Sequence, residues 1–304
     1  MNKTFIADLI RSNTGVINSL IRKSSWVYLA MPVTLIFGVI NTGILARSLG
    51  LDNYGLINII IAITGFISGL FSAISSEALT SFITKELKND KVYVSELIKK
   101  FYTLQVFSGI FAFLVILVFS APLSELLGIQ KNSIKYLLLY GITPIFSSVL
   151  WVLISILRLF DRYSYYFYQT LSLGLIKTIF FILIYYLGGS LTHFIYALII
   201  LQLIQSLILS IITRKVLINE GFDVGKFYSF PTGFGQEIKN YLFYNFGKSI
   251  FRSIGLYADI LILSALTTST QTVGIYKGAK RIQEILLMSL KGIESVLFPE
   301  YSKI

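Results

Sequence analysis

Charged side chains recur at helical spacing inside two very apolar stretches of this chain, residues 242–266 and 282–298. At 100° per residue, Lys248, Arg252 and Asp259 fall within one arc of about 80° on the first stretch. The second stretch and its leading edge carry a similar stripe, made of Lys277, Lys280, Arg281, Glu284 and Lys291. A charge that faces lipid costs about 2.5–3.5 kcal/mol at a helix centre. Two adjacent polar stripes therefore predict water or a polar cargo between these helices.

The sign of these charges indicates the kind of cargo. A further basic residue, Lys177, lies near the middle of another apolar stretch, and basic side chains outnumber Asp259 and Glu284. Guanidinium and ammonium groups are the usual partners of phosphate, so an anionic cargo is expected. The candidate cargo-binding residues are Lys177, Lys248, Arg252, Asp259, Lys280, Arg281, Glu284 and Lys291.

Two structural explanations compete with a cargo path. The pairs Arg252 with Asp259 and Glu284 with Lys291 could neutralise one another as ion pairs. Lys177 could instead extend its ammonium group to the membrane surface.

The sequence offers little for catalysis. It contains no cysteine, which excludes disulfides, thiol nucleophiles and cysteine zinc sites. The single histidine, His193, lies at a break between two apolar stretches and is expected to be an interfacial polar residue. We find no phosphate-binding loop, nucleophile triad or metal-ligand spacing, so the sequence predicts no enzymatic activity, no cofactor and no metal.

Composition and hydropathy assign the chain to the membrane. Of its 304 residues 55% are hydrophobic and 13% charged, and the mean hydropathy is +0.76. A span needs about 20 apolar residues, and the uniform apolarity favours helices over barrel strands. We therefore predict an all-α integral membrane protein with about eight spans, at residues 26–47, 55–76, 101–123, 134–157, 165–187, 192–212, 242–266 and 282–298.

Basic residues are distributed unevenly between the alternate connections. The N-terminal segment and the connections on its side hold 15 Lys and Arg residues, against 3 on the other side. The positive-inside rule then places the N-terminus in the cytoplasm and accounts for most of the net charge of +11 without nucleic acid as a partner. Residues 1–24 alternate apolar and basic groups as an amphipathic interfacial helix does.

The chain divides into two unequal helical lobes. Six spans fill residues 25–213, a Gly-containing and polar cytoplasmic linker is expected at 214–240, and residues 241–304 hold the first two spans of an incomplete second lobe. A weak repeat supports this division. An apolar run followed by Tyr54-Gly55 in the first lobe is matched by one followed by Val273-Gly274 in the second. Transporters commonly contain such halves, with the cargo path between them.

The motifs Ala46-Arg47-Ser48-Leu49-Gly50 with Tyr54-Gly55, and Val273-Gly274-Ile275-Tyr276 with Ala279 and Arg281, resemble those of O-antigen-type polysaccharide repeat-unit flippases. These flippases belong to the MATE-like multidrug/oligosaccharidyl-lipid/polysaccharide exporter superfamily. The resemblance implies two six-helix lobes, a cationic central cavity, and export of undecaprenyl-diphosphate-linked oligosaccharides by alternating access across the bacterial inner membrane. The implied partners are lipid-linked oligosaccharide and membrane lipids, with H⁺ or Na⁺ as candidate coupling ions.

Two other functions stay open at this point. A MATE-type cation or drug antiporter would have an acidic cavity, whereas the stripes found here are mainly basic. A membrane enzyme of glycan assembly would have a large outer loop with Arg, His or Asp, and the predicted outer connections are short.

The charge asymmetry makes a topological prediction. Single cysteines introduced at Lys88, Arg162 or Lys226 should be protected from a membrane-impermeant thiol reagent in intact cells. Cysteines at Asp52, Ser190 or Thr268 should react, and the cysteine-free parent chain provides the background. Labelling of Lys226→Cys from outside would contradict the predicted orientation.

Overall fold

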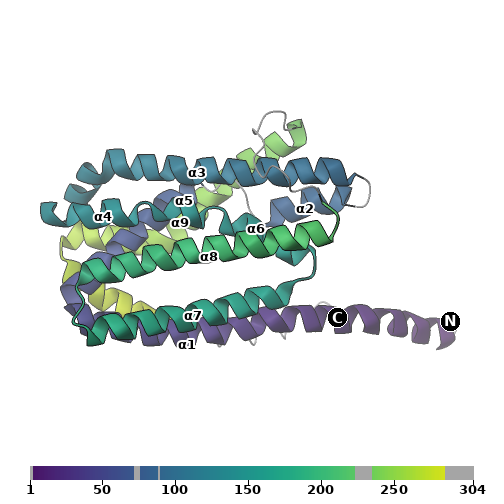
Figure 1. The fold of residues 1–304 in the computed structure, drawn as a ribbon, viewed down its shortest axis with the longest axis horizontal. Coiled ribbons are helices and arrows are strands. Elements are labelled where there is room, and N and C mark those ends of the chain that lie inside the picture. Colours follow the sequence, from purple (N-terminus) through teal and green to yellow (C-terminus); the bar gives the residue numbers. More distant parts are fainter. Residues whose placement is uncertain (1–2, 72–75, 88–89, 223–234, 285–304) are drawn as a thin grey trace.

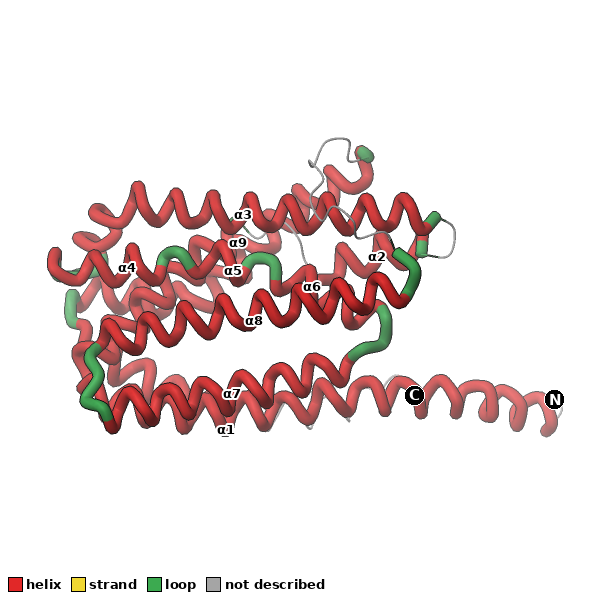
Figure 2. The backbone as a smooth tube through the Cα atoms, viewed as in Figure 1, coloured by secondary structure: helices red, strands yellow, loops and turns green. Residues whose placement is uncertain are grey.

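The computed structural model describes residues 3–71, 76–87, 90–222 and 235–284. Within these ranges the protein consists of helices and the loops that join them, without strands (Figure 2). Six of the described segments are long and apolar enough to cross a membrane. The predicted all-α membrane fold is therefore confirmed.

The helices run back and forth along the long axis of the molecule (Figure 1). They are α1 (Lys3–Leu70), α2 (Ser76–Glu86), α3 (Lys91–Leu126), the short 3₁₀ helix η1 (Lys131–Ser133), α4 (Ile134–Tyr140), α5 (Thr143–Ser147), α6 (Leu150–Leu159), α7 (Tyr163–Tyr186), α8 (Leu191–Asn219) and α9 (Gln236–Thr267). Residues 270–284 form a further helical segment.

Helix α1 contains the first predicted span, 26–47, and most of the second, 55–76. Gly50 interrupts it with φ 69° and ψ 170°, a left-handed and extended conformation that glycine adopts without steric cost. The side chain of Tyr54 lies beside that of Thr42. These residues would be about 18 Å apart along one straight helix, so the chain folds back at Gly50. We name the two parts the first arm (3–49) and the second arm (51–70). The end of the molecule at which α1 reverses its direction is called the Gly50 end (Figure 1).

Local sequence signals set the other helix ends. Asp90 caps α3 by accepting a hydrogen bond from the Tyr93 backbone N–H at 2.9 Å. Gly188 has φ 66° in the turn before α8, whose N-terminus is closed by a capping box between Ser190 and His193. His193 is thus an exposed capping residue, as expected from its place between two spans.

The fourth predicted span is not one continuous helix. It is divided into α4, α5 and α6, with breaks around Ile142 and Val149 on either side of Pro144. Proline lacks an N–H and its ring clashes with the preceding turn, so a helix bends or breaks at this residue. Residues at both breaks keep right-handed helical φ and ψ angles, and all three short helices border a polar space described below.

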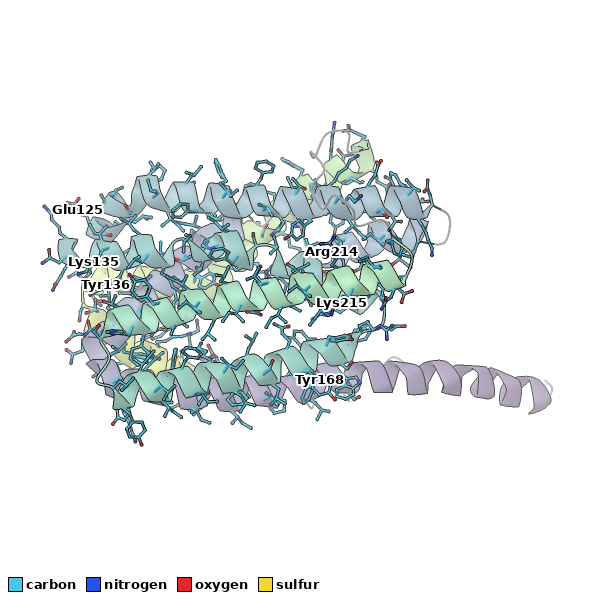
Figure 3. All side chains as sticks on the ribbon, viewed as in Figure 1. Glu125, Lys135, Tyr136, Tyr168, Arg214 and Lys215 are labelled. Carbon is cyan, nitrogen blue, oxygen red and sulfur yellow. The ribbon has the colours of Figure 1, made fainter. Side chains whose placement is uncertain are left out.

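Polar groups gather at the two ends of the helix bundle. Figure 3 shows Glu125 and Lys135 at the Gly50 end, while Arg214 and Lys215 lie toward the other end of α8. Large apolar side chains such as Leu117 and Phe119 are about half exposed between these ends. An exposed apolar belt between polar ends is what a bilayer requires.

Glycines bring the second arm of α1 into close contact with the following lobe. A Cβ at Gly55 would lie 1.7 Å from the Thr270 carbonyl oxygen and 3.0 Å from the backbone nitrogen of Gly274. Farther along the arm, Gly65 lies against the Tyr257 ring and Gly69 against the Ser253 hydroxyl. The small residues of this arm therefore let neighbouring helices pack closely against it, and the two glycines of the repeat touch each other.

The structure bears on parts of the predicted domain limits. Residues 3–24 continue α1 without a break, while helix ends at Asn219 and Gln236 shorten the non-helical part of the predicted 214–240 linker. Most of the eighth predicted span lies outside the described residues.

The glycine contacts lead to a stability test. Gly55→Ala should lower the free energy of unfolding by about 1–3 kcal/mol, since its methyl group would overpack the contact with Thr270. Gly247→Ala is the matched control, because a Cβ there meets no atom within 4 Å. Thermal unfolding in detergent, followed by circular dichroism, would measure both. Equal effects would mean that the Gly55 crossing does not limit stability.

Candidate functional site

A polar cavity of about 680 Å³ lies between the second arm of α1, α3, the broken α4–α6 segment, α8 and α9. Three basic residues line it: Arg158, Lys248 and Arg252. Among the described residues of its wall none is acidic. We refer to this space as the cationic cavity.

The spacing of the lining residues along α6 and α9 places them on the helix faces that border the cationic cavity. Lys248 and Arg252 are four residues apart on α9 and therefore lie on one face. Trp151 and Arg158 are seven residues apart on α6, which again places them on one face. Tyr140, from α4, enters the cavity wall because the helix breaks before Pro144.

Aromatic rings support the two arginines. The Arg252 guanidinium lies 5.3 Å from the Trp151 ring, and that of Arg158 lies 5.3 Å from the Tyr166 ring. A guanidinium on an aromatic face keeps its N–H edge available for an anion. The Arg158 Nε is buried without a described hydrogen-bond partner, so this group has unused capacity to donate.

Neutral polar side chains complete the wall. Gln105, Gln202 and Asn245 line the cavity together with Tyr140 and Tyr257. Gln105 is 1% exposed, and its Oε1 has no described partner. Amides and phenol rings are groups to which hydroxyl-rich molecules can bind through hydrogen bonds and ring contacts.

Four other candidate residues form a separate group together with Tyr276 and Lys277. We name this group the ion-pair cluster (Asp259, Tyr276, Lys277, Lys280, Arg281, Glu284). Asp259 Oδ2 accepts hydrogen bonds from the Tyr276 hydroxyl, at 2.7 Å, and from Lys280. Glu284 pairs with Arg281 at 2.5 Å and Lys277 at 3.5 Å. None of these residues is among the described lining of the cationic cavity.

Contacts with the first arm of α1 hold the ion-pair cluster in place. The Arg281 guanidinium lies directly on Gly38, where a Cβ would come within 1.2 Å of Nη2. On α7, Lys177 lies 5.3 Å from the Phe181 ring and is also outside the cavity lining. A side chain at position 38 would displace the Arg281 guanidinium from this position.

The structure therefore divides the single predicted cargo site into two. It brings Lys248 and Arg252 together in the cavity, and it places Asp259, Lys280, Arg281 and Glu284 in ion pairs beside α1. The expected partners also differ, since Asp259 pairs with Lys280 instead of Arg252. Lys291 lies outside the described residues.

Arg158 lines the cavity but is not among the predicted site residues. The fourth predicted span ends at residue 157, whereas α6 continues to Leu159 and carries Arg158 into the cavity wall. Its spacing of two helical turns from Trp151 was the available signal.

The ion-pair cluster leads to a coupling experiment. Asp259→Asn and Lys280→Met should each destabilise the protein, because each leaves the other group without its ion-pair partner. The double variant should be less destabilised than the sum, with a coupling energy of about 0.5–3 kcal/mol. Thermal unfolding in detergent measures all four proteins. Strictly additive effects would show that this pair contributes no net interaction energy.

Comparisons with known proteins place this geometry in a family. The family model described as polysaccharide biosynthesis protein matches residues 20–304. Comparison with curated proteins gives no match.

Solved structures show the same fold. One is the inward-facing conformation of a multidrug resistance MATE family transporter of the MOP superfamily, with 14% identity and a TM-score of 0.63, covering 84% of this chain and 61% of that one. A Vibrio cholerae MATE transporter mutant has 13% identity and a TM-score of 0.57 over 91% and 70% of the two chains. A MOP superfamily transporter from Pyrococcus furiosus has 13% identity and a TM-score of 0.51 over 93% and 70%.

The chain thus spans 61% of the length of the first of these transporters. It shares their multi-pass helical arrangement, and its sequence matches one family over almost its whole length. The chain belongs to the polysaccharide biosynthesis protein family and has the fold of MOP superfamily transporters.

Proposed function

We propose that this protein takes part in flipping undecaprenyl-diphosphate-linked oligosaccharide repeat units across the bacterial inner membrane, for the synthesis of O-antigen-type surface polysaccharide. The observation that carries this proposal is the sign of the cavity lining, because Arg158, Lys248 and Arg252 line the cavity and the described part of its wall contains no acidic residue. A diphosphate is a compact anion that accepts several charge-assisted hydrogen bonds. Membership in a polysaccharide biosynthesis family supports a glycan as the attached group.

The rest of the cavity wall suits the sugar part of such a cargo. Gln105, Gln202 and Asn245 offer amide donors and acceptors next to Tyr140 and Tyr257. A single space can therefore hold the diphosphate on its basic side and hydroxyl groups on its amide side.

An antiporter for cationic drugs is the main alternative. It would need negative charge facing its cargo, and Asp259 and Glu284 are already paired with basic groups outside the cavity. Fold similarity to multidrug transporters does not decide between the two, because one fold hosts many functions. The Pyrococcus furiosus transporter is itself described as having a binding pocket of reversed polarity that suggests a different function.

Alternating access would use the contacts between the lobes. We propose that residues 25–213 move relative to the following lobe, with the N-terminus in the cytoplasm and the segment 1–24 at the membrane surface. The ion-pair cluster and the Gly55 crossing would then belong to the moving interface. Transport against a gradient needs an energy source, and H⁺ or Na⁺ flow is our candidate.

The proposal predicts which arginines bind the cargo. Arg158→Ala and Arg252→Ala should each weaken binding of undecaprenyl diphosphate in detergent by roughly 10- to 150-fold, which corresponds to a charge-assisted bond of about 1.5–3 kcal/mol. Arg252→Lys should recover part of the affinity, because the charge remains while the guanidinium fork is lost. Scintillation proximity with radiolabelled undecaprenyl diphosphate would measure these affinities.

Arg162→Ala is the matched control for these variants. It removes a basic residue one turn from Arg158 that pairs with Glu220 at 3.8 Å and does not line the cavity. Its affinity should match that of the parent protein. If all three alanine variants lose affinity equally, or lose it only in proportion to folded protein, the cationic cavity is not the anion site.

A further inference from the structure

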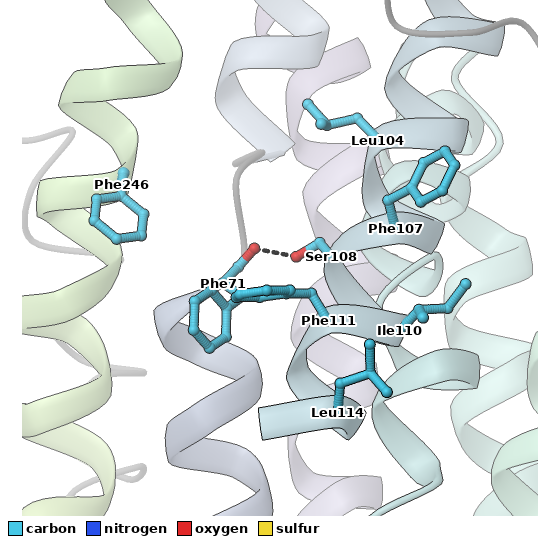
Figure 4. Close-up of a pocket in the computed structure, with 8 residues that line it drawn as sticks. All are labelled: Phe71, Leu104, Phe107, Ser108, Ile110, Phe111, Leu114 and Phe246. Atoms are coloured by element: carbon cyan, nitrogen blue, oxygen red, sulfur yellow. Dashed lines mark hydrogen bonds between the residues drawn. The ribbon is translucent and has the colours of Figure 1, made fainter. Parts of the chain in front are cut away.

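An apolar groove of about 480 Å³ lies where the second arm of α1, α3 and α9 meet (Figure 4). Its wall is made of Phe71, Leu104, Phe107, Ser108, Ile110, Phe111, Leu114 and Phe246, so Ser108 is the one polar residue of the described lining. Phe71 and Phe111 pack edge to face, with ring centroids 4.8 Å apart. We name this space the apolar groove.

The apolar groove and the cationic cavity share a boundary. Ser108 lines both spaces, and its hydroxyl donates a hydrogen bond to the carbonyl oxygen of Phe71 (Figure 4). On α9, Phe246 faces the groove while its neighbour Asn245 lines the cavity. The two spaces therefore adjoin at Ser108, with basic and polar side chains in the lining of one and almost entirely apolar side chains in the lining of the other.

We propose that the apolar groove holds the hydrocarbon chain of the lipid-linked cargo while the diphosphate of the same molecule lies in the cationic cavity. This inference rests on the proposed function. A polyprenyl diphosphate joins a charged group directly to an apolar hydrocarbon chain. In the protein, likewise, the cationic cavity directly adjoins the apolar groove. Six residues separate Phe246 from Arg252 on α9, which is about 9 Å along the helix.

The role of the groove is to orient the hydrocarbon chain of the cargo. Lipid tails are as apolar as leucine side chains, so transfer of a polyprenyl chain from bilayer to groove yields little hydrophobic free energy. Binding of the diphosphate instead raises the local concentration of the attached chain near the groove. Occupancy of the groove should therefore depend on the anion site, which distinguishes a cargo chain from bulk lipid.

Leucines on α3 provide a matched pair for testing this. Leu114 lines the groove and is 48% exposed, while Leu117, three residues later, is 49% exposed and is not part of the lining. The photoreactive residue p-benzoylphenylalanine is introduced at one or the other, in the whole chain reconstituted in phospholipid vesicles. The probe is radiolabelled undecaprenyl diphosphate. If a leucine variant misfolds, a second pair of positions is available. Phe107 lines the groove and is 49% exposed, and its control Phe119 is 52% exposed and is not part of the lining.

We expect several-fold more cross-linking at Leu114 than at Leu117. The excess should disappear when Arg252→Ala is added or when inorganic diphosphate competes for the cavity. Equal labelling at both positions, or labelling at Leu114 that persists with Arg252→Ala, would overturn the groove assignment and indicate contact with the probe as bulk lipid.

A parallel measurement separates this inference from the proposed function. Binding of inorganic diphosphate should weaken with Arg252→Ala and should be unchanged by Leu114→Trp, which fills only the groove. If Arg252→Ala leaves diphosphate binding intact, the proposed function fails and the groove assignment with it. If diphosphate binding behaves as expected but the position-specific cross-link is absent, the groove assignment alone fails.

Discussion

A charged side chain inside a bilayer needs an opposite charge, an aromatic face or water within reach, since its isolated insertion costs about 2.5–3.5 kcal/mol. This protein meets that need in two ways. Asp259 and Glu284 are neutralised by neighbouring Lys and Arg residues in the ion-pair cluster. In the cationic cavity, Arg252 lies against Trp151 beside a polar space. In the ion-pair cluster the charges neutralise one another, whereas in the cationic cavity positive charge faces the open space.

Close approach of helices makes this separation of charges possible. The second arm of α1 carries glycines where α9 and the segment 270–284 cross it. At Gly55 two backbones lie nearer than a side chain would allow, while Gly65 and Gly69 accommodate the side chains of Tyr257 and Ser253. Near the Gly50 end, the Ser264 hydroxyl of α9 donates to the Leu127 carbonyl oxygen, at the end of α3, at 2.7 Å. The arm is thereby fixed between the ion-pair cluster and the cationic cavity.

Polarity changes again at the wall between the cationic cavity and the apolar groove. The Ser108 hydroxyl donates from α3 to the carbonyl oxygen of Phe71, which directly follows the end of α1 at Leu70. A single hydroxyl therefore satisfies a backbone acceptor in an otherwise apolar wall. The result is two adjoining spaces of different chemistry, one suited to an anion and the other to a hydrocarbon chain.

The sequence by itself determined the class of protein, most span positions and the basic character of α9. These properties follow from local composition and periodicity, which depend on neighbours along one helix. The mixed stripe on residues 245–259 was predicted correctly as one helical face, yet its two ends have different surroundings. Lys248 and Arg252 line the cavity, while Asp259, about two turns farther on, meets Lys280.

Only the tertiary structure decided which charges pair and which remain facing a cavity. Pairing depends on where a second helix crosses, and the crossings depend on glycines such as Gly38 and Gly55 meeting residues more than 200 positions away. The same holds for Arg158, whose helix α6 extends past the predicted span and borders the cavity. Helical periodicity determines on which side of its helix a residue lies. The neighbour that this residue contacts is determined by long-range packing.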